Sequence, residues 1–238
     1  MSHLKSASKQ IRCSQVAEPK NLAFYVKICR VIFDFAEDAH VSAAQLRGFL
    51  GYVFIDDAEF HHHSDKAYHY PLIQYKNVAG SLCVLGLQNY AALLAKKIAA
   101  VDVISTPQST LHVRCKRIRI QIEEIVQKFC YYEFITPWLA LNEINYSLFR
   151  TLDKRKRRKF LERILVANVL SCLKGLGIHV NFRIKANIYQ YKALRVKVHD
   201  NLFVGFLLRF RLNILLPDLI GLGKSVSKGY GTIRRVDV

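Results

Sequence analysis

Four of the nine histidines in this 238-residue chain lie in one polar segment, residues 59–70, with the sequence EFHHHSDKAYHY. In an extended segment alternate side chains point the same way, so His61 and His63 share one side, and Tyr68 and Tyr70 also share a side. Imidazole titrates near neutral pH, so one ring can accept a hydroxyl proton while another group returns a proton to a leaving oxygen. Phosphodiester cleavage requires these two transfers, which makes this segment, the histidine loop, a candidate for that chemistry.

Two other interpretations of the histidine loop are a polar surface segment and an adventitious metal site. A structural metal site needs about four ligands, and the chain has no Cys-x-x-Cys pair to supply partners. We therefore expect no metal ion and no cofactor. Reduced thiols in the cytoplasm are the simplest interpretation of the six scattered cysteines, at positions 13, 29, 83, 115, 130 and 172.

A second candidate is the glycine-rich loop, residues 221–231, where two Gly-x-Gly pairs bracket a basic segment. Glycine permits positive φ and close backbone approach, so consecutive N–H groups can turn toward a phosphate while Lys224 and Lys228 add charge. A Walker loop is excluded because Asp218 stands where its first glycine is required, and a dinucleotide fingerprint because Val226 replaces a required glycine. The alternative is a flexible surface turn.

The composition favours a nucleic-acid partner. Thirty-six Lys and Arg against eighteen Asp and Glu give a net charge of +18, and a hydrophobic fraction of 51% excludes general disorder. Residues 1–12 are polar and basic, so we expect no signal peptide. The most apolar stretch, residues 202–216, is broken by Arg209 and Arg211 before the ~18 apolar residues that a spanning helix needs, so we expect no membrane partner.

Hydrophobic periodicity indicates two α+β domains, over residues 20–127 and 128–238. The first half has a β-α-β-β-α-β order: a strand at 22–34, a helix capped by Ser42 and ending near 52, a hairpin of 72–78 and 81–87, a helix at 89–100, a loop at 105–110 and a strand at 113–126. The order then begins again: strands at 131–141 and 179–186 on either side of a helix at 153–175, then strands at 194–198 and 208–212 joined near residues 200–201.

Basic residues gather at two places in the second half. On one side of the strands of that half the charged side chains are all basic, which favours binding of a phosphate backbone along the sheet. Few aromatic residues lie on that side, so base stacking is not expected there. The run at residues 154–159 opposes the dipole of the helix that it begins, a cost that a bound anion relieves. Both places can instead be solvated surface. The sheet residues are Arg183, Lys185, Arg195, Lys197, Arg209 and Arg211.

The glycine-rich loop resembles that of CRISPR-associated RAMP proteins, and the chain is similar to the repeat-processing endoribonucleases of the Cas-six family, b-type. Further motifs extend the likeness across most of the chain. They are Leu46-Arg47-Gly48-Phe49, the segment of residues 70–76, Trp138 with Leu141-Asn142 and Asn145-Tyr146, and Pro217 before the loop. The resemblance implies tandem ferredoxin-like (RRM/RAMP-like) domains with a C-terminal glycine-rich loop.

The resemblance also implies a metal-independent cut within CRISPR repeat RNA. The ribose 2′-hydroxyl attacks the neighbouring phosphate and leaves 2′,3′-cyclic phosphate and 5′-hydroxyl ends. A histidine after the first helix serves in proton transfer in the related enzymes, which maps onto His63 or His61, and we favour His63. The family more often has two histidines separated by one residue, so the three consecutive histidines here do not decide between them. Tyr68 or Tyr70 would position the ribose or assist the transfer.

The expected partner is precursor CRISPR RNA, with interference-complex subunits as further partners. Lys76 or Lys224 would stabilise charge on the phosphorane. Family members dimerise, but no heptad seam or symmetric patch is visible, so a homodimer stays open. The alternatives are a noncatalytic RAMP subunit that binds guide RNA and a general RNA-binding protein. The expected RNA-binding residues are Lys76, Lys154, Arg155, Arg157, Arg158, Gly221, Gly223, Lys224, Ser225, Lys228, Gly229 and Gly231.

Overall fold

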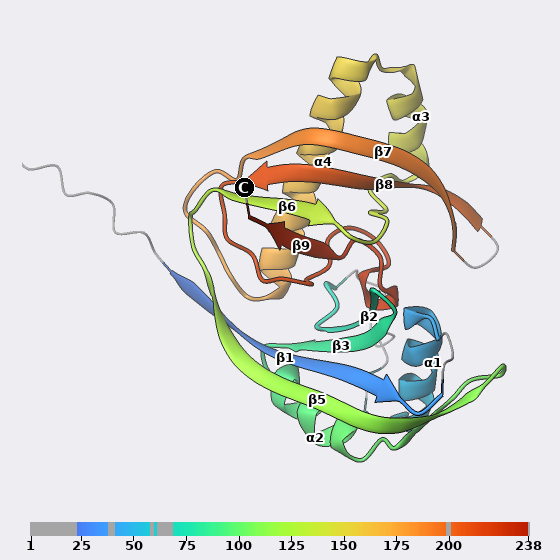
Figure 1. Ribbon diagram of the computed structural model, residues 1–238. Coiled ribbons are helices and arrows are strands. Elements are labelled where there is room, and N and C mark those ends of the chain that lie inside the picture. The colour runs from blue at the N-terminus through green and yellow to red at the C-terminus, as the bar shows by residue number, and fades with distance from the viewer. Residues whose placement is uncertain (1–22, 38–40, 58–59, 61–68, 199–200, 238) are drawn as a thin grey trace, which may run out of the picture.

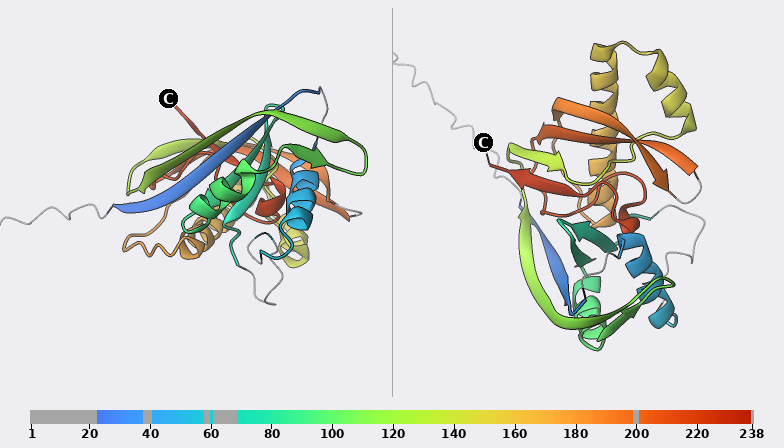
Figure 2. Two further views of the ribbon diagram at one scale, coloured as in Figure 1. Left: turned by 90° about the horizontal axis from the view of Figure 1, so that it is seen from below. Right: turned by 45° about the vertical axis from the view of Figure 1, so that its right-hand side comes forward.

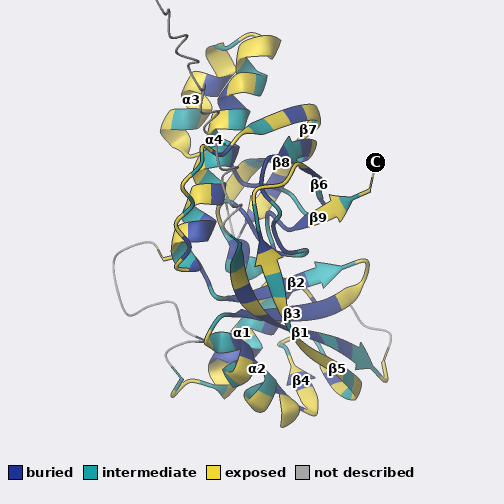
Figure 3. Cartoon of the chain, turned by 90° about the vertical axis from the view of Figure 1, so that its left-hand side faces the viewer, coloured by how far each residue is buried: buried dark blue, intermediate teal, exposed yellow. Residues whose placement is uncertain are grey.

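The computed structural model describes residues 23–37, 41–57, 60, 69–198 and 201–237, and it contains two antiparallel sheets, each with helices packed on it (Figure 1). Buried residues concentrate in the strands and the inward faces of the helices (Figure 3). The structure confirms the α+β class. No helix in the described part of the chain is long and apolar enough to cross a bilayer.

The N-terminal half has the strand order β2-β3-β1-β5-β4, which is the ferredoxin-like order with one short strand added at the edge. Every element expected here is present within a few residues of its predicted bounds. The helix start is explained by Ser42, whose Oγ accepts the N–H of Gln45 while the Gln45 side chain accepts the N–H of Ser42. The elements are β1 (Phe24–Phe35), α1 (Ala43–Val53), β2 (Ile73–Val78), β3 (Ser81–Leu87), α2 (Tyr90–Ala99), β4 (Val103–Ser105) and β5 (Thr110–Ile125).

The C-terminal half has the order β7-β8-β6-β9, again ferredoxin-like, so the tandem architecture is confirmed. An irregular segment, residues 213–232, stands where the second helix of such a unit would lie, and it carries the glycine-rich loop. Trp138 stacks on Phe134 with ring centroids 5.2 Å apart at the centre of this core. The elements are β6 (Cys130–Phe134), α3 (Glu143–Thr151), α4 (Lys154–Gly175), β7 (Ala186–Val198), β8 (Asn201–Leu212), the 3₁₀ helix η2 (Val226–Lys228) and β9 (Ile233–Val236).

Four expectations for the second half are corrected. The strand expected at residues 131–141 ends at Phe134, because Pro137 cannot continue the ladder. Helix α3 was not expected; it begins at Asn142, whose side chain accepts the N–H of Asn145, and most of its surface is exposed. Strands β7 and β8 are longer than the two short strands predicted.

The fourth correction concerns residues 179–185, which were expected to form a strand and are irregular. The side chain of Asn213 takes the place of a strand partner: its Nδ2 donates to the carbonyl of Arg183 at 3.0 Å, and its Oδ1 accepts the N–H of Lys185 at 2.6 Å. The alternation of apolar residues in this segment reflects packing of an extended chain on the core. The side-chain amide of Asn213 therefore bonds the backbone groups of Arg183 and Lys185, which the sequence pattern predicted to pair with a neighbouring strand.

Replacing Asn213 by alanine should lower the free energy of unfolding by about 1–3 kcal/mol, because two partly buried backbone groups lose their partner. Urea denaturation measures the change, with Asn201→Ala at the exposed start of β8 as the control. An unchanged midpoint for Asn213→Ala would contradict this role.

Candidate functional site

The histidine loop is described only at its two ends. Its candidate catalytic residues His61, His63 and Tyr68 lie outside the described residues, so their roles stay predictions. At one end Phe60 is buried and its ring lies 4.7 Å from a second phenylalanine ring. At the other end Tyr70 is buried. The segment therefore starts and finishes at packed points of the fold.

Tyr70 ties the end of the histidine loop to the glycine-rich loop. Its hydroxyl donates to the carbonyl of Gly221 at 2.7 Å and accepts from Nε2 of Gln74 at 2.9 Å. The Oε1 of Gln74 in turn accepts the N–H of Gly221 at 3.0 Å. Because the hydroxyl proton is committed to a buried carbonyl, the geometry favours a positioning role for Tyr70 over proton transfer.

Close packing explains two of the loop's glycines. At Gly231 (φ +64°) a Cβ would lie 1.9 Å from the carbonyl oxygen of Leu222, and at Gly223 (φ +95°) it would lie 2.7 Å from the ring of Trp138. The loop is thus a tightly packed element and not the flexible surface turn considered above. Its packing also commits much of its backbone, because seven loop amides donate to protein acceptors and are not available for the expected phosphate cradle. They belong to Gly221, Leu222, Lys224, Lys228, Gly229, Tyr230 and Gly231.

The glycine-rich loop carries two cationic side chains, Lys224 and Lys228. Lys224 is exposed, and its Nζ lies 3.4 Å from the carbonyl of Leu141. Lys228 lies in η2, which packs against α1, and its pKa is lowered by partial burial and by the nearby charge of Arg47. The Nε of Arg47 is buried without a hydrogen-bond partner among the described residues. Two like charges held together favour an anion at this junction.

A small cavity of about 210 Å³ opens between α4, the glycine-rich loop and the end of the histidine loop. This volume is below the roughly 300–1,000 Å³ of pockets that enclose whole small molecules. The cavity is therefore suited to one group of a larger ligand. Its lining residues are Tyr70, Asn168, Ser171, Gly223 and Lys224.

Lys76 lies beneath the glycine-rich loop and not on the surface. It is fully buried, and its Nζ donates to Oγ1 of Thr232 at 3.3 Å. Burial lowers its pKa to about 7. In this structure the residue has no exposed surface through which to make the RNA contact expected from the sequence, and its position suggests that it supports the loop from below.

Most residues of the basic run at the start of α4 are exposed, whereas Arg157 bonds to the end of α3. Lys154 and Arg155 are exposed, as expected for contacts with a polyanion. Arg157 instead donates from Nε and Nη2 to the carbonyls of Phe149 and Arg150, which end α3. The opposing helix dipole is partly relieved within the protein by the N-cap, Asp153. The other members of the run are Lys156 and Lys159, both exposed, and the partly buried Arg158.

The basic sheet face expected from the sequence is broken by a bulge in β7 between Ile188 and Gln190. Paired residues of an antiparallel ladder share a face. Beyond the bulge Arg195 pairs with Val204, whereas Arg209 pairs with Gln190, so these two arginines lie on opposite faces. Lys197 lies with Arg195, and the expected residues Arg183 and Lys185 lie outside the sheet altogether.

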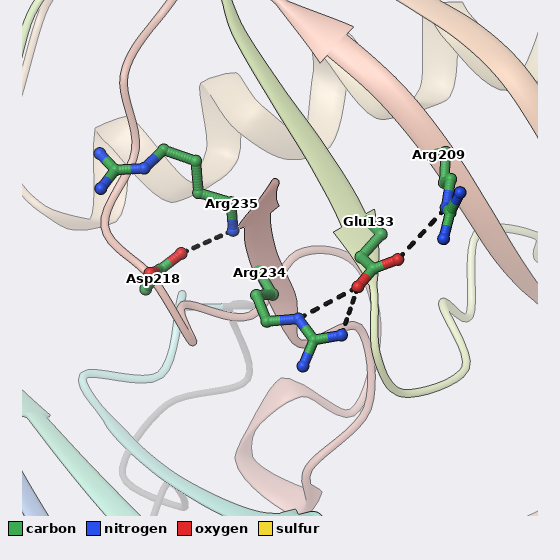
Figure 4. Close-up of polar contacts among 5 residues, drawn as sticks. All are labelled: Glu133, Arg209, Asp218, Arg234 and Arg235. Carbon is green, nitrogen blue, oxygen red and sulfur yellow. Dashed lines mark hydrogen bonds and ion pairs between the residues drawn. The ribbon is translucent and has the colours of Figure 1, made fainter. Parts of the chain in front are cut away.

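Arg209 has an acidic neighbour on the adjacent strand β6. Glu133 lies between Arg209 and Arg234 and accepts from their Nε atoms at 3.3 and 3.0 Å (Figure 4). The hydrogen bond from Arg234, followed by the charges of both arginines, lowers the pKa of Glu133. Nearby, the Asp218 carboxylate accepts the backbone N–H of Arg235 at 2.6 Å. The cluster partly neutralises this face.

The same face carries aromatic rings, contrary to expectation. The rings of Tyr131 and Tyr189 stack with centroids 5.9 Å apart, and the guanidinium of Arg211 lies 4.7 Å from the centroid of Phe129. Phe129 is 60% exposed and Tyr189 45% exposed. Sequence periodicity missed Tyr189 because it sits at the bulge and missed Phe129 because it precedes β6.

Comparison with known proteins gives matches along nearly the whole chain. The family description of the Cas6b N-terminal domain matches residues 24–124, and that of the Cas6b C-terminal domain matches residues 124–236. An uncharacterized protein of Methanocaldococcus jannaschii is 39% identical over 121 residues, covering 50% of this chain and 82% of that protein.

Solved structures agree with these matches. A crystal structure of Cas6b is 26% identical with a TM-score of 0.81, covering 90% of this chain and 100% of that one. A crystal structure of the CRISPR RNA processing endoribonuclease Cas6b is 24% identical with a TM-score of 0.71, again covering 90% and 100%, and shows the same fold. An RAMP protein binding different RNA substrates shares the fold more distantly, with a TM-score of 0.52 at 11% identity over 89% of this chain and 100% of that one.

Replacing Lys76 by methionine should stabilise the protein, and the gain should depend on pH. The folded-state pKa of about 7 lies below the ordinary 10.5, so the unfolded state binds more protons between these values and wild-type stability rises with pH across that window. We expect a gain in unfolding free energy of about 2–5 kcal/mol near neutral pH that shrinks toward pH ~10.

Urea denaturation at several pH values measures this difference, and Lys96→Met, at an exposed position of α2, is the control. A gain that is the same at every pH would contradict a buried amine at position 76.

Proposed function

Because this chain belongs to the Cas6b family, we propose that it is an endoribonuclease that cuts CRISPR precursor RNA within its repeats and releases guide RNAs. The observation that carries the proposal is the Tyr70–Gly221 contact, which joins the histidine loop to the basic glycine-rich loop beside a small cavity. The contact supports the proposal because the described end of the histidine loop lies against the basic glycine-rich loop.

The proposed reaction is a transesterification. The ribose 2′-oxygen forms a bond to the adjacent phosphorus and gives its proton to a base, while the bond to the 5′-oxygen breaks and that oxygen takes a proton from an acid. The products are a 2′,3′-cyclic phosphate and a 5′-hydroxyl, and the step needs neither water nor metal. We assign proton transfer to His63 or His61, assistance to Tyr68, charge stabilisation to Lys224 and positioning to Tyr70.

Removing both candidate histidines should abolish cleavage without abolishing binding. Wild type and His61→Ala/His63→Ala are incubated in EDTA with end-labelled repeat RNA, and the product ends are identified. We expect the variant to be at least ~10²-fold slower, the usual contribution of a proton-transfer group. His112→Ala is the control, because His112 is an exposed histidine paired with Glu37 in the first domain.

The outcomes separate the alternatives. Loss of wild-type cleavage on chelation, or full activity of the double variant, would overturn the proposed mechanism. Tight binding without cleavage by either protein would instead support the noncatalytic subunit that binds guide RNA.

Lys224→Ala should weaken RNA binding in a salt-dependent way. Each lost phosphate contact lowers the magnitude of the slope of log K against log salt by about 0.7–0.9. Filter binding at several salt concentrations measures the slope, with Lys96→Ala as the control. An unchanged slope would place Lys224 outside the RNA path.

A further inference from the structure

A second and larger cavity lies along helix α4. It is a groove of about 1,060 Å³ between α4 and the irregular segment of residues 182–186, and Leu152, just after α3, also lines it. Figure 2 shows α4 lying along the C-terminal sheet with α3 folded back beside it. The lining follows α4 from Lys156 to Leu170, which is about 21 Å of helix. Pockets that enclose a whole small molecule hold roughly 300–1,000 Å³, so this groove is large enough for a segment of another chain.

The floor of the groove is apolar and partly open to solvent. Leu170 is 46% exposed, and Val166 and Phe182 are partly exposed. Covering such a floor with apolar side chains removes its surface from water, which is favourable. RNA bases stack on exposed aromatic rings, and the aromatic residue of this lining, Phe182, is only partly exposed. The other apolar residues of the floor are Leu152, Ile184 and Ala186.

The rim of the groove is basic. Two of its cations have contacts within the protein, because Lys156 pairs with Asp153 and the guanidinium of Arg163 lies 5.5 Å from the centroid of a phenylalanine ring. The carboxylate of Glu162, which also lines the groove, accepts a backbone N–H of β7 at 2.9 Å. The remaining rim cations are exposed and have no carboxylate partner among the described residues, so they attract a negatively charged ligand. They are Lys159, Arg183 and Lys185.

The groove and the small cavity beside Tyr70 lie on different flanks of α4. Asn168 and Ser171 line the small cavity, whereas Val166 and Leu170 line the groove. At 3.6 residues per turn, the two pairs point about 150° apart around the helix. A ligand in the groove therefore leaves the candidate functional site uncovered.

We propose that the groove binds an acidic amphipathic helix of another protein, with apolar side chains on the floor and carboxylates at the rim. A helix fits better than a strand, because the carbonyl of Arg183 and the N–H of Lys185 are already bonded to Asn213, whereas a helix satisfies its own backbone. Residues 1–22 of this chain lack the required charge, since they contain four basic residues and one acidic residue. The inference goes beyond the proposed nuclease and is independent of cleavage.

A designed peptide tests the chemistry of the groove. The probe is a fluorescein-labelled helical peptide of about 14 residues with leucine at every third or fourth position and glutamate and alanine elsewhere. The control peptide has the same composition, with its leucines dispersed around the helix. Fluorescence anisotropy should give saturable binding of the probe with a Kd below about 100 µM, and binding of the control should be at least ~10-fold weaker.

Two variants and a cross-link place the probe on the protein. Leu170→Ser removes part of the floor and Lys185→Glu turns an attraction into a repulsion, so each should weaken probe binding about 10-fold or more. The matched controls Leu202→Ser, at a position 70% exposed on β8, and Lys192→Glu, on exposed β7, should not. A zero-length carbodiimide should join probe carboxylates to the amine of Lys159 or Lys185 but not to that of Lys192.

The same variants test RNA as the other occupant. Leu170→Ser changes no charge, so it should leave the affinity for repeat RNA unaltered in filter binding. An equal loss of RNA and probe affinity would place the groove in the RNA path and overturn the proposal. Equal binding of the two peptides, which would show attraction by charge alone, or no saturable binding would also overturn it. Cleavage enters none of these readouts, so failure here would be distinct from failure of the proposed nuclease.

Discussion

The hydrogen bonds among Tyr70, Gln74 and Gly221 join segments that lie about 150 residues apart in sequence, at separations of 151 and 147 residues. All three groups are buried, so each would leave an unsatisfied partner if another were lost. They fix the end of the histidine loop against the glycine-rich loop. The contact between the two domains therefore depends on this set of hydrogen bonds at Tyr70.

Around that contact the glycine-rich loop is built as packing and not as an open cradle. It takes the place of the second helix of the C-terminal unit, and its glycines let the backbone approach Leu222 and the ring of Trp138. In a helix at this position most backbone amides would donate hydrogen bonds within the helix. The loop also commits much of its backbone to protein acceptors, which leaves the side chains of Lys224 and Lys228 as its cationic groups. Lys76 supports the loop from below, and burial of its amine lowers the stability of the folded protein.

The first domain could be predicted almost completely because its signals are local. Ser42 and Gln45 mark a helix start, and the hairpin of β2 and β3 turns at Ala79 and Gly80, both with positive φ. The second domain could not, since its deviations come from tertiary contacts. A single side chain, Asn213, replaces a ladder, and one extra residue at the bulge after Ile188 reverses every later side chain of β7.

The same reasoning explains what the sequence could say about the site. Residue types identified the two loops, and the resemblance supplied their roles, but neither could show that Lys76 points inward or that Arg157 caps α3.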